Sequence, residues 1–138
     1  MLVDELKSIA RNNGIVGAGG AGFPAYAKMT EKADTVILNC VECEPLLKLH
    51  RQLLATHTEE IIQMLDEVRE SFGAKEAVIG IKSEYVTTIK AIEEVIGDFP
   101  NVRICALKAA YPMGDEVVLI YEATGRVIKP GGLPIDEN

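Results

Sequence analysis

Apolar residues follow two alternating patterns along this chain, short continuous runs and longer stretches with a helical period. Continuous runs, rich in β-branched residues, occupy positions 35–39, 76–81 and 102–107. Such runs are typical of strands that are buried on both faces. Helical spacing covers positions 2–11, 45–72, 83–96 and the stretch that leads up to Gly125. The alternation of strands and helices predicts a layered α/β domain with a mainly parallel sheet.

Local signals refine the helix boundaries. The sequence Asn12-Asn13-Gly14 predicts the end of the first helix. A capping box at Thr56-His57-Thr58-Glu59 predicts that the long helical stretch restarts there, and Ser83 is a candidate cap for the helix that follows. We therefore expect a break near His57.

Length and composition restrict the class of protein. The 138 residues are enough for one domain with its own core, and 14 basic against 21 acidic residues give a net charge of −7. This balance disfavours nucleic acid as a partner. No apolar run approaches the length of a membrane span, and the N-terminus lacks the order of a signal peptide. We expect a single domain over residues 1–138, no direct membrane insertion and a cytoplasmic location.

Ligands of parallel α/β sheets bind outside the carboxyl ends of the strands. Here that rule places together the segments at 39–45, 82–84 and 110–116, each of which follows a predicted strand. The glycine-rich stretch at 14–24 leads into the first strand and is expected to fold over the same edge. These four segments form the candidate site.

Five glycines lie within positions 14–24. Three of them, Gly17, Gly19 and Gly22, match G-x-G-x-x-G, but the motif follows a helix instead of a strand, so the usual dinucleotide assignment is weak. Phe23 in place of lysine excludes a P-loop. Backbone N–H groups free of Cβ atoms favour contact with a phosphate or a flat cofactor, and Pro24 suits the first position of a helix. A flexible loop or tight helix packing is the alternative.

Two pairs of acidic residues lie at the expected ligand edge: Glu42 with Glu44, and Asp115 with Glu116. Carboxylates repel phosphate, so hydrogen bonding to the hydroxyl or amide groups of a ligand is their more plausible binding role. Acidic residues near a helix N-terminus are also favoured by the helix dipole. Both interpretations stay open on the sequence alone.

Cys40 and Cys43 form a single C-x-x-C at the predicted junction of strand and helix. A helix N-terminus there would support dithiol chemistry, whereas one pair of cysteines is too few for zinc or a cluster. Small buried residues are the favoured interpretation of the cysteines. His50 and His57 serve no catalytic motif, and no metal site is predicted.

Four motifs in order carry a family likeness: residues 17–24 followed by Lys28, residues 39–45, residues 111–116 and residues 131–134. Together they resemble the RnfC-like electron transport proteins, which are related to the 51 kDa FMN- and NADH-binding subunit of respiratory complex I. The run at 42–50 is also similar to the RnfC-like protein associated with proline reductase. The likeness covers nearly the whole chain.

The resemblance implies a three-layer Rossmann-like α/β domain, as in the complex I 51 kDa subunit, with FMN and NADH as cofactors. It also implies electron transfer from NADH to iron–sulfur clusters outside this chain. The expected partners are a small-molecule dinucleotide and other subunits or domains of an electron-transfer complex. These partners would hold the protein at the cytoplasmic face of a membrane.

The likeness also implies roles for individual residues in cofactor binding. The expected FMN-lining glycines are Gly17, Gly19, Gly20 and Gly22, with Lys28 near the phosphate. Phe23 and Glu44 are expected at NADH, and Asn39 and Glu42 at the flavin. Gly114, Asp115 and Glu116 would complete the cleft. No residue is expected to be catalytic in its own right.

The sequence departs from the family pattern at Ala18, where complex I has arginine, and at Val41, where it has aspartate. The chain ends at Asn138, before the asparagine-rich segment that completes the flavin site in the family. We therefore expect a fragment of a longer RnfC-like NADH:acceptor oxidoreductase subunit, inactive as an isolated domain. The alternative is a cofactor-free assembly or interaction module of an electron-transfer complex. A dithiol redox protein that uses Cys40 and Cys43 is a third hypothesis.

Overall fold

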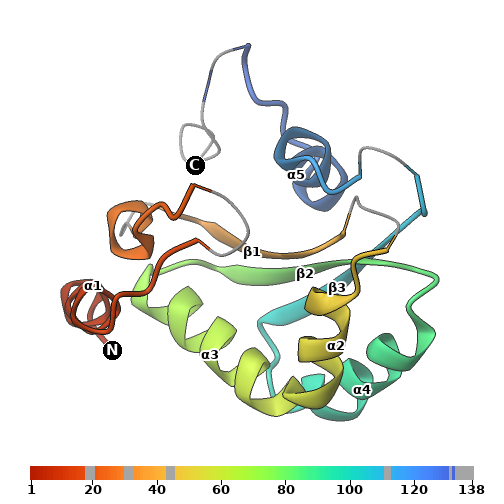
Figure 1. Cartoon of the computed structure of the whole chain (residues 1–138), viewed down its shortest axis with the longest axis horizontal. Coiled ribbons are helices and arrows are strands. Elements are labelled where there is room, and N and C mark those ends of the chain that lie inside the picture. The colour runs from red at the N-terminus through yellow and green to blue at the C-terminus, as the bar shows by residue number, and fades with distance from the viewer. Residues whose placement is uncertain (18–20, 30–32, 43–45, 111–112, 131, 133–138) are drawn as a thin grey trace.

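A parallel sheet lies at the centre of the fold. The computed structural model describes residues 1–17, 21–29, 33–42, 46–110, 113–130 and 132. Within them, β1 (Thr35–Cys40), β2 (Glu76–Lys82) and β3 (Val102–Leu107) pair in parallel in the order β1-β2-β3 (Figure 1). Ile37 pairs with Val78, and Ile79 with Ile104. The three predicted strands and their parallel pairing are confirmed.

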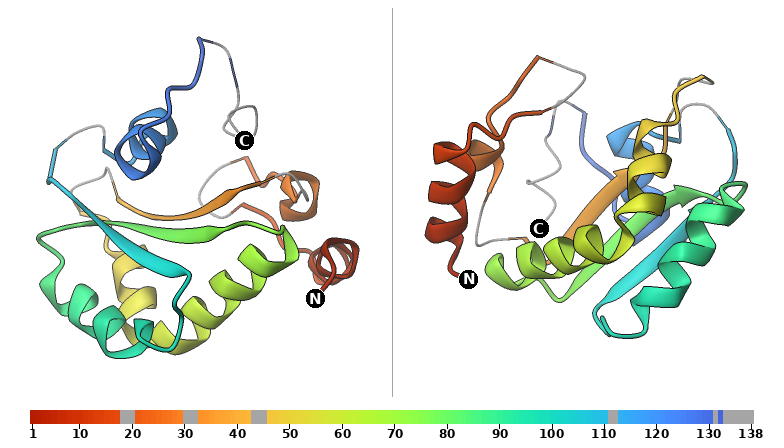
Figure 2. Two further views of the ribbon diagram at one scale, coloured as in Figure 1. Left: turned by 180° about the vertical axis from the view of Figure 1, so that it is seen from behind. Right: turned by 60° about the horizontal axis from the view of Figure 1, so that its bottom comes forward.

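Helices cover both faces of this sheet. One face carries α2 (Leu49–Thr56), α3 (Thr58–Ser71) and α4 (Val86–Ile96), and the other carries α5 (Glu116–Thr124). The left view of Figure 2 shows α5 across the sheet from α2, α3 and α4. The first helix, α1 (Val3–Asn12), packs beside the short 3₁₀ helix η1 (Ala25–Lys28). This arrangement confirms the predicted three-layer α/β fold.

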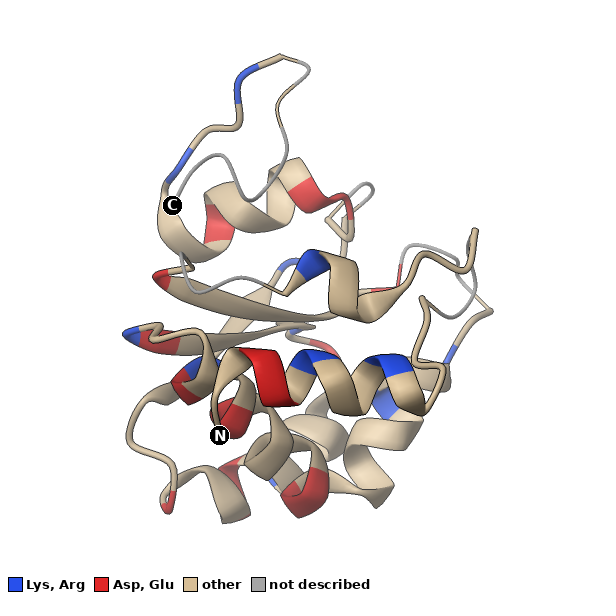
Figure 3. Ribbon diagram, turned by 90° about the vertical axis from the view of Figure 1, so that its left-hand side faces the viewer, with Lys and Arg blue, Asp and Glu red and all other residues tan. Residues whose placement is uncertain are grey.

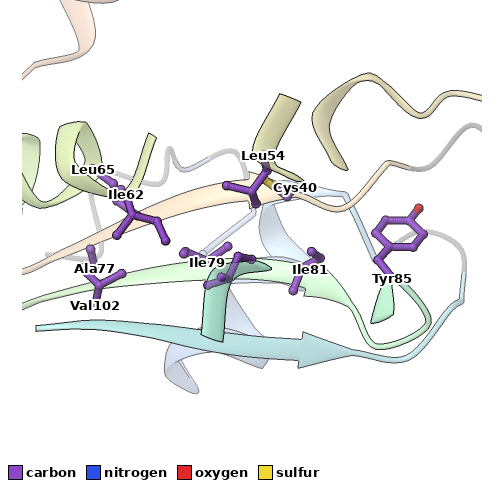
Figure 4. Close-up of a cluster of buried hydrophobic side chains, with 10 residues drawn as sticks. Cys40, Leu54, Ile62, Leu65, Ala77, Ile79, Ile81, Tyr85 and Val102 are labelled. Carbon is purple, nitrogen blue, oxygen red and sulfur yellow. The ribbon is translucent and has the colours of Figure 1, made fainter. Parts of the chain in front are cut away.

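The larger core lies between the sheet and α2–α4. Because successive side chains of a strand point to opposite faces, β2 turns Ala77, Ile79 and Ile81 toward these helices. All three are fully buried (Figure 4). Ile62 of α3 and Ile92 of α4 pack against them and are equally inaccessible to solvent. Each buried isoleucine contributes about 1.5–3 kcal/mol through the hydrophobic effect.

A smaller core lies on the opposite face, under α5. It is centred on Leu119, which packs with Val41 and Leu107. Gly80 of β2 makes room for this helix, because a Cβ added at Gly80 would lie only 2.6 Å from Cδ1 of Leu119. The glycine therefore sets how closely α5 approaches the sheet.

The expectation that every strand is buried on both faces is correct for β2 and wrong for the two edge strands, β1 and β3, of which β3 has Arg103 and Ala106 exposed. Residues 77–81 are all buried, whereas residues 35–38 are only half-buried and Asn39 is exposed. The reason is topological: β1 is an edge strand, and α5 packs on β2 and β3. The outer face of β1 is thus left open.

The helical stretch breaks at His57 as predicted, but no capping box causes the break. The Thr56 hydroxyl donates to the Gln52 carbonyl at 2.9 Å, and the Thr58 hydroxyl donates to the Leu54 carbonyl at 2.7 Å. Both hydroxyls therefore bond backward into α2. Ser83 is not a cap either, since α4 begins at Val86 and has no side-chain cap.

Charged residues of both signs are interspersed along the ribbon (Figure 3). Arg103 of β3 reaches across to Glu76 of β2 with an Nε–Oε2 distance of 2.8 Å. This hydrogen bond lowers the pKa of Glu76. None of the helices in the described part of the chain has the length and apolarity needed to cross a membrane.

Candidate functional site

The open face of β1 forms one wall of a cavity of about 400 Å³. Alternation along the strand places Thr35, Ile37 and Asn39 on this wall. The opposite wall comes from α5 and the residues just after it, and Lys28 enters from the end of η1. The complete described lining is Lys28, Asp34, Thr35, Ile37, Asn39, Glu116, Leu119, Ile120, Thr124 and Arg126.

An ion pair lies at the end of the cavity where β1 begins. Arg126 meets the Asp34 carboxylate through both terminal nitrogens, and the Nη1–Oδ1 distance is 2.8 Å. The guanidinium holds the pKa of Asp34 below its ordinary value. Because the two residues are 92 positions apart, this bidentate pair fixes the segment after α5 against the start of β1.

Asn39 ties the other end of β1 to the approach to α5. Its Nδ2 donates to the Gly114 carbonyl at 3.1 Å, and its Oδ1 accepts from the Val41 N–H at 3.0 Å. The segments that follow the first and third strands therefore meet, as predicted. The segment after β2 divides: the Ser83 N–H donates to the Leu107 carbonyl at the end of β3 at 2.8 Å, whereas Glu84 lines a different cavity, between α2 and α4.

Glu42 is a buried carboxylate, 5% exposed. Its Oε1 accepts from the backbone N–H of His50, in the first turn of α2, at 2.9 Å. Its Oε2 is buried and has no hydrogen-bond partner among the residues that the structure describes. The helix-capping interpretation thus holds for one oxygen, while the other remains an open acceptor.

The acidic residues at α5 have separate positions. Asp115 is the N-cap of the helix, and its Oδ1 accepts from the N–H groups of Val117 and Val118 at 3.0 and 3.4 Å. Glu116, one residue later, lines the cavity. Of this pair, Asp115 therefore caps the start of the helix, and Glu116 faces the cavity. Glu44 lies outside the described residues.

The described ends of the glycine-rich stretch pair in an antiparallel way just before η1, where Val16 bridges to Pro24. Gly17 donates its N–H to the Phe23 carbonyl at 2.9 Å, and Gly22 has a φ of +67°, which favours glycine. Phe23 is half-exposed, with the Lys28 Nζ 5.2 Å from its ring centroid. Of these residues only Lys28 reaches the cavity wall. Gly19 and Gly20 lie outside the described residues.

Sequence reasoning misses several cavity residues. The apolar run assigns Thr35 and Ile37 to a strand that is buried on both faces, whereas both line the cavity. Their position could be identified only by combining the edge position of the strand with the rule that successive side chains point to opposite faces. Asp34 and Arg126 carry no motif, since the distance between them in sequence hides their pairing. The apolar wall of α5, Leu119 and Ile120, belongs to a predicted helix for which the sequence indicates no function.

The cysteine environment argues against dithiol chemistry at Cys40. Burial, with a contribution from the Glu42 carboxylate, raises the pKa of the Cys40 thiol to about 12. A reactive dithiol needs a lowered pKa. Cys43 lies outside the described residues. Among the residues that the structure describes, no group of three His, Cys, Asp or Glu side chains is placed to hold a metal ion.

Cys40 is therefore expected to resist alkylation. With a thiol pKa of about 12, the thiolate fraction at pH 8 is about 10⁻⁴. Cys105 is partly accessible and should react first, although burial also raises its pKa. Peptide mass spectrometry after timed treatment with iodoacetamide measures each cysteine separately. Rapid modification of Cys40 in the folded protein would contradict this expectation.

Comparisons with known proteins agree on one family. Residues 10–138 match the family model described as the Nuo51 FMN-binding domain. The chain is 38% identical over 130 residues to cobalamin reductase PduS of Citrobacter freundii, covering 94% of this chain and 28% of that protein. It is 35% identical over 140 residues to a component of the Na(+)-translocating ferredoxin:NAD(+) oxidoreductase complex of Acetobacterium woodii, covering 99% of this chain and 32% of that protein.

A solved structure shows the same fold. The chain aligns with a subunit of an NAD+-reducing [NiFe]-hydrogenase in its air-oxidized state with a TM-score of 0.75 and 25% identity. The alignment covers 94% of this chain and 25% of that chain. The chain thus spans less than a third of the length of the curated relatives above.

Proposed function

Because the chain belongs to the family of the Nuo51 FMN-binding domain, we propose that it binds FMN and NADH as one domain of an RnfC-like electron-transfer oxidoreductase. In this role electrons from NADH leave through iron–sulfur centres held outside residues 1–138. The cavity along the open face of β1 is the observation that supports the proposal, because it combines predicted cofactor residues from three separate segments: Lys28, Asn39 and Glu116.

The residues of this cavity fit a flavin nucleotide. Its volume of about 400 Å³ falls within the range of small-molecule sites, roughly 300–1,000 Å³. Ile37, Leu119 and Ile120 supply an apolar wall against which a flat ring system packs. Lys28 supplies a cation for a phosphate, and it makes no ion pair within the described residues.

Asn39 is held in one orientation by its two backbone hydrogen bonds. An amide nitrogen carries two donors, so one N–H of Asn39 remains for a ligand after the bond to Gly114. Glu42 offers its unpartnered Oε2 as an acceptor. Asn39 orients the polar edge of the ligand, and the apolar wall excludes water from its ring. Glu42 lies outside the described lining of the cavity, so its proposed contact with the flavin rests on the family likeness.

FMN, when bound, supplies the redox chemistry, taking up an electron pair from a hydride donor and releasing the electrons singly. We propose NADH as a second ligand, and the names of two similar proteins support this, since both refer to NAD+. Phe23 is placed for stacking because its ring is half-exposed beside Lys28. Glu44, Gly114 and the glycines at positions 17, 19, 20 and 22 complete the proposed site.

The proposed partners are other subunits or domains of an electron-transfer complex. This follows from the relatives whose names describe parts of such complexes. Partners of this kind would carry the domain to the cytoplasmic face of a membrane. An exposed run of leucines, Leu46, Leu47, Leu49 and Leu53, is available for such contacts.

Titration with FMN, followed by quenching of flavin fluorescence, tests the proposal. The protein is expected to bind FMN, and Lys28→Gln should weaken binding about tenfold by removing one phosphate contact. Lys90→Gln is the matched control, because Lys90 is an exposed residue of α4, across the sheet from the cavity. A parallel NADH titration tests the second ligand.

Absence of FMN binding at millimolar concentration, in this chain and in a protein extended beyond residue 138, would contradict the proposed function. Cofactor-independent binding to subunits of an electron-transfer complex would then favour the assembly module instead.

A further inference from the structure

The outer side of β1 is an unpaired sheet edge (Figure 1). The Lys75 N–H donates to the Asp34 carbonyl at 2.9 Å, so the backbone of Asp34 faces β2. Backbone groups alternate sides along a strand, and therefore Thr35, Ile37 and Asn39 direct their N–H and C=O groups away from β2. Within the described residues no strand pairs with this outer row of donors and acceptors.

The position of α5 distinguishes this edge from the open edge of β3. The connections from β1 to β2 and from β2 to β3 pass through α2, α3 and α4 on one face, whereas α5 follows β3 on the other face. Connections between parallel strands are almost always right-handed. A helix on the opposite face therefore leads the chain in the opposite direction, back past β2 and β1. The first free parallel position in that direction is beside β1.

The contacts at the two ends of α5 show that the chain has already made this return. Before the helix, the Gly114 carbonyl accepts from Asn39, near the carboxyl end of β1. After the helix, Arg126 pairs with Asp34, where β1 begins. The segment after α5 is therefore held at the point where a strand parallel to β1 would start.

The apolar surface of α5 is larger than three strands can cover. Residues 117–121 are five consecutive apolar residues, and at about 100° per residue they surround the helix. Leu119 packs on the sheet, and Ile120 faces the cavity opposite Ile37. A helix that is apolar on all sides is normally buried on all sides. A strand beside β1 would widen the sheet under α5 and give these side chains more surface to pack on.

The residues directly after Arg126 do not have the character of this strand. The Gly132 N–H donates to the Lys129 carbonyl at 2.8 Å in a turn, and Pro130 and Pro134 lack the N–H that a central strand needs. Four residues follow Pro134 in the sequence, whereas a strand usually has about five or six. The strand is therefore expected mainly beyond residue 138. The curated relatives, of which this chain spans less than a third, have the length to hold it.

We propose that β1 accepts a fourth strand, parallel to it, from the polypeptide that follows residue 138. The strand would be covered by α5 on one face and would continue the packing surface of Val36 and Leu38 on the other. An apolar, β-branched sequence like that of β2 fits such a position. In the plane of the sheet it would close the outer side of the cavity along β1. The inference does not depend on the binding of FMN or NADH.

Amide hydrogen exchange, followed by NMR without cofactor, tests the proposal in the 138-residue chain and in the protein extended past residue 138. In the shorter protein Thr35 and Ile37 should exchange at least about a hundredfold faster than Val36 and Leu38, whose N–H groups face β2. Extension should slow Thr35 and Ile37 to the rates of their neighbours. Val36 and Leu38 are the internal control and should change by less than about threefold. NOEs between β1 and residues after 138 should show a parallel register.

Unchanged exchange of Thr35 and Ile37 in the extended protein overturns the proposal, as does a reading frame that stops at residue 138. Slow exchange already present in the 138-residue chain and lost on dilution would assign the edge to a second copy, which also overturns it. NOEs that place a different segment beside β1 have the same consequence. Slowed exchange in a protein that fails to bind FMN would contradict the proposed function alone.

Discussion

Glu42→Gln is expected to stabilise the cofactor-free protein and to weaken its binding of FMN. The carboxylate is buried, and within the described residues its Oε2 has no hydrogen-bond partner, so part of its desolvation cost is not offset. Glutamine retains an oxygen that accepts from the His50 N–H and removes the charge. We expect the free energy of unfolding to rise by about 1 kcal/mol.

The same substitution removes the acceptor that is proposed to face the flavin. Hydrogen bonds to charged groups contribute roughly 1.5–3 kcal/mol, which corresponds to about a 10- to 100-fold loss of FMN affinity. Urea denaturation and fluorescence titration measure the two effects separately. The pKa of the Cys40 thiol should also fall, because the Glu42 carboxylate helps to raise it.

Glu59→Gln is the matched control for these measurements. Glu59 lies in the first turn of α3 and is exposed, whereas Glu42 precedes α2 and bonds to its first turn from outside the helix. Its substitution should change stability by only a few tenths of a kcal/mol and leave FMN affinity unchanged. If Glu42→Gln lowered stability and left FMN affinity intact, Glu42 would be a helix cap without a role in binding.

The two carboxylate oxygens of Glu42 show what can and cannot be predicted from the sequence at this site. The sequence leaves helix capping and ligand contact as alternatives, and the structure assigns one carboxylate oxygen to the cap and leaves the other open. Asp115 and Glu116 divide the same two functions between adjacent residues. A linear pattern identifies such acids but does not determine the direction of each oxygen.

Strands and helices are predictable because their signals are local. The apolar runs identify all three strands, and the helical period identifies the long helices, since core packing requires these periodicities. The exposure of β1 is not predictable in this way, because it depends on α5, which lies about 80 residues later in the sequence. Its apolar run resembles that of β2, although only β2 is fully covered.

Helix caps and long-range ion pairs are the weakest part of the prediction. Thr56 and Ser83 have the residue types of caps, yet neither caps a helix, because hydroxyls also bond to preceding carbonyls. The pairing of Asp34 with Arg126 depends on tertiary contact alone. Such contacts determine the ends of the cavity, so its complete lining emerges only from the fold.

Gly80→Ala should destabilise the protein and disturb the proposed cofactor cavity together. The new methyl group would lie 2.6 Å from Cδ1 of Leu119, so the leucine or the whole of α5 must move. Overpacking of this kind costs roughly 1–3 kcal/mol. Leu119 also lines the first cavity, so FMN affinity should fall in the same variant.

Gly97→Ala, at the end of α4, separates packing from the intrinsic effect of replacing a glycine. Gly97 has a φ of −59°, and an added Cβ would meet no atom within 4 Å, so alanine should be neutral or stabilise by up to about 1 kcal/mol. Thermal denaturation, FMN titration and the amide spectrum of α5 compare the two variants. A Gly80→Ala protein with wild-type stability and unshifted α5 signals would show that the helix tolerates the methyl group. In that case Gly80 would not control the width of the cavity.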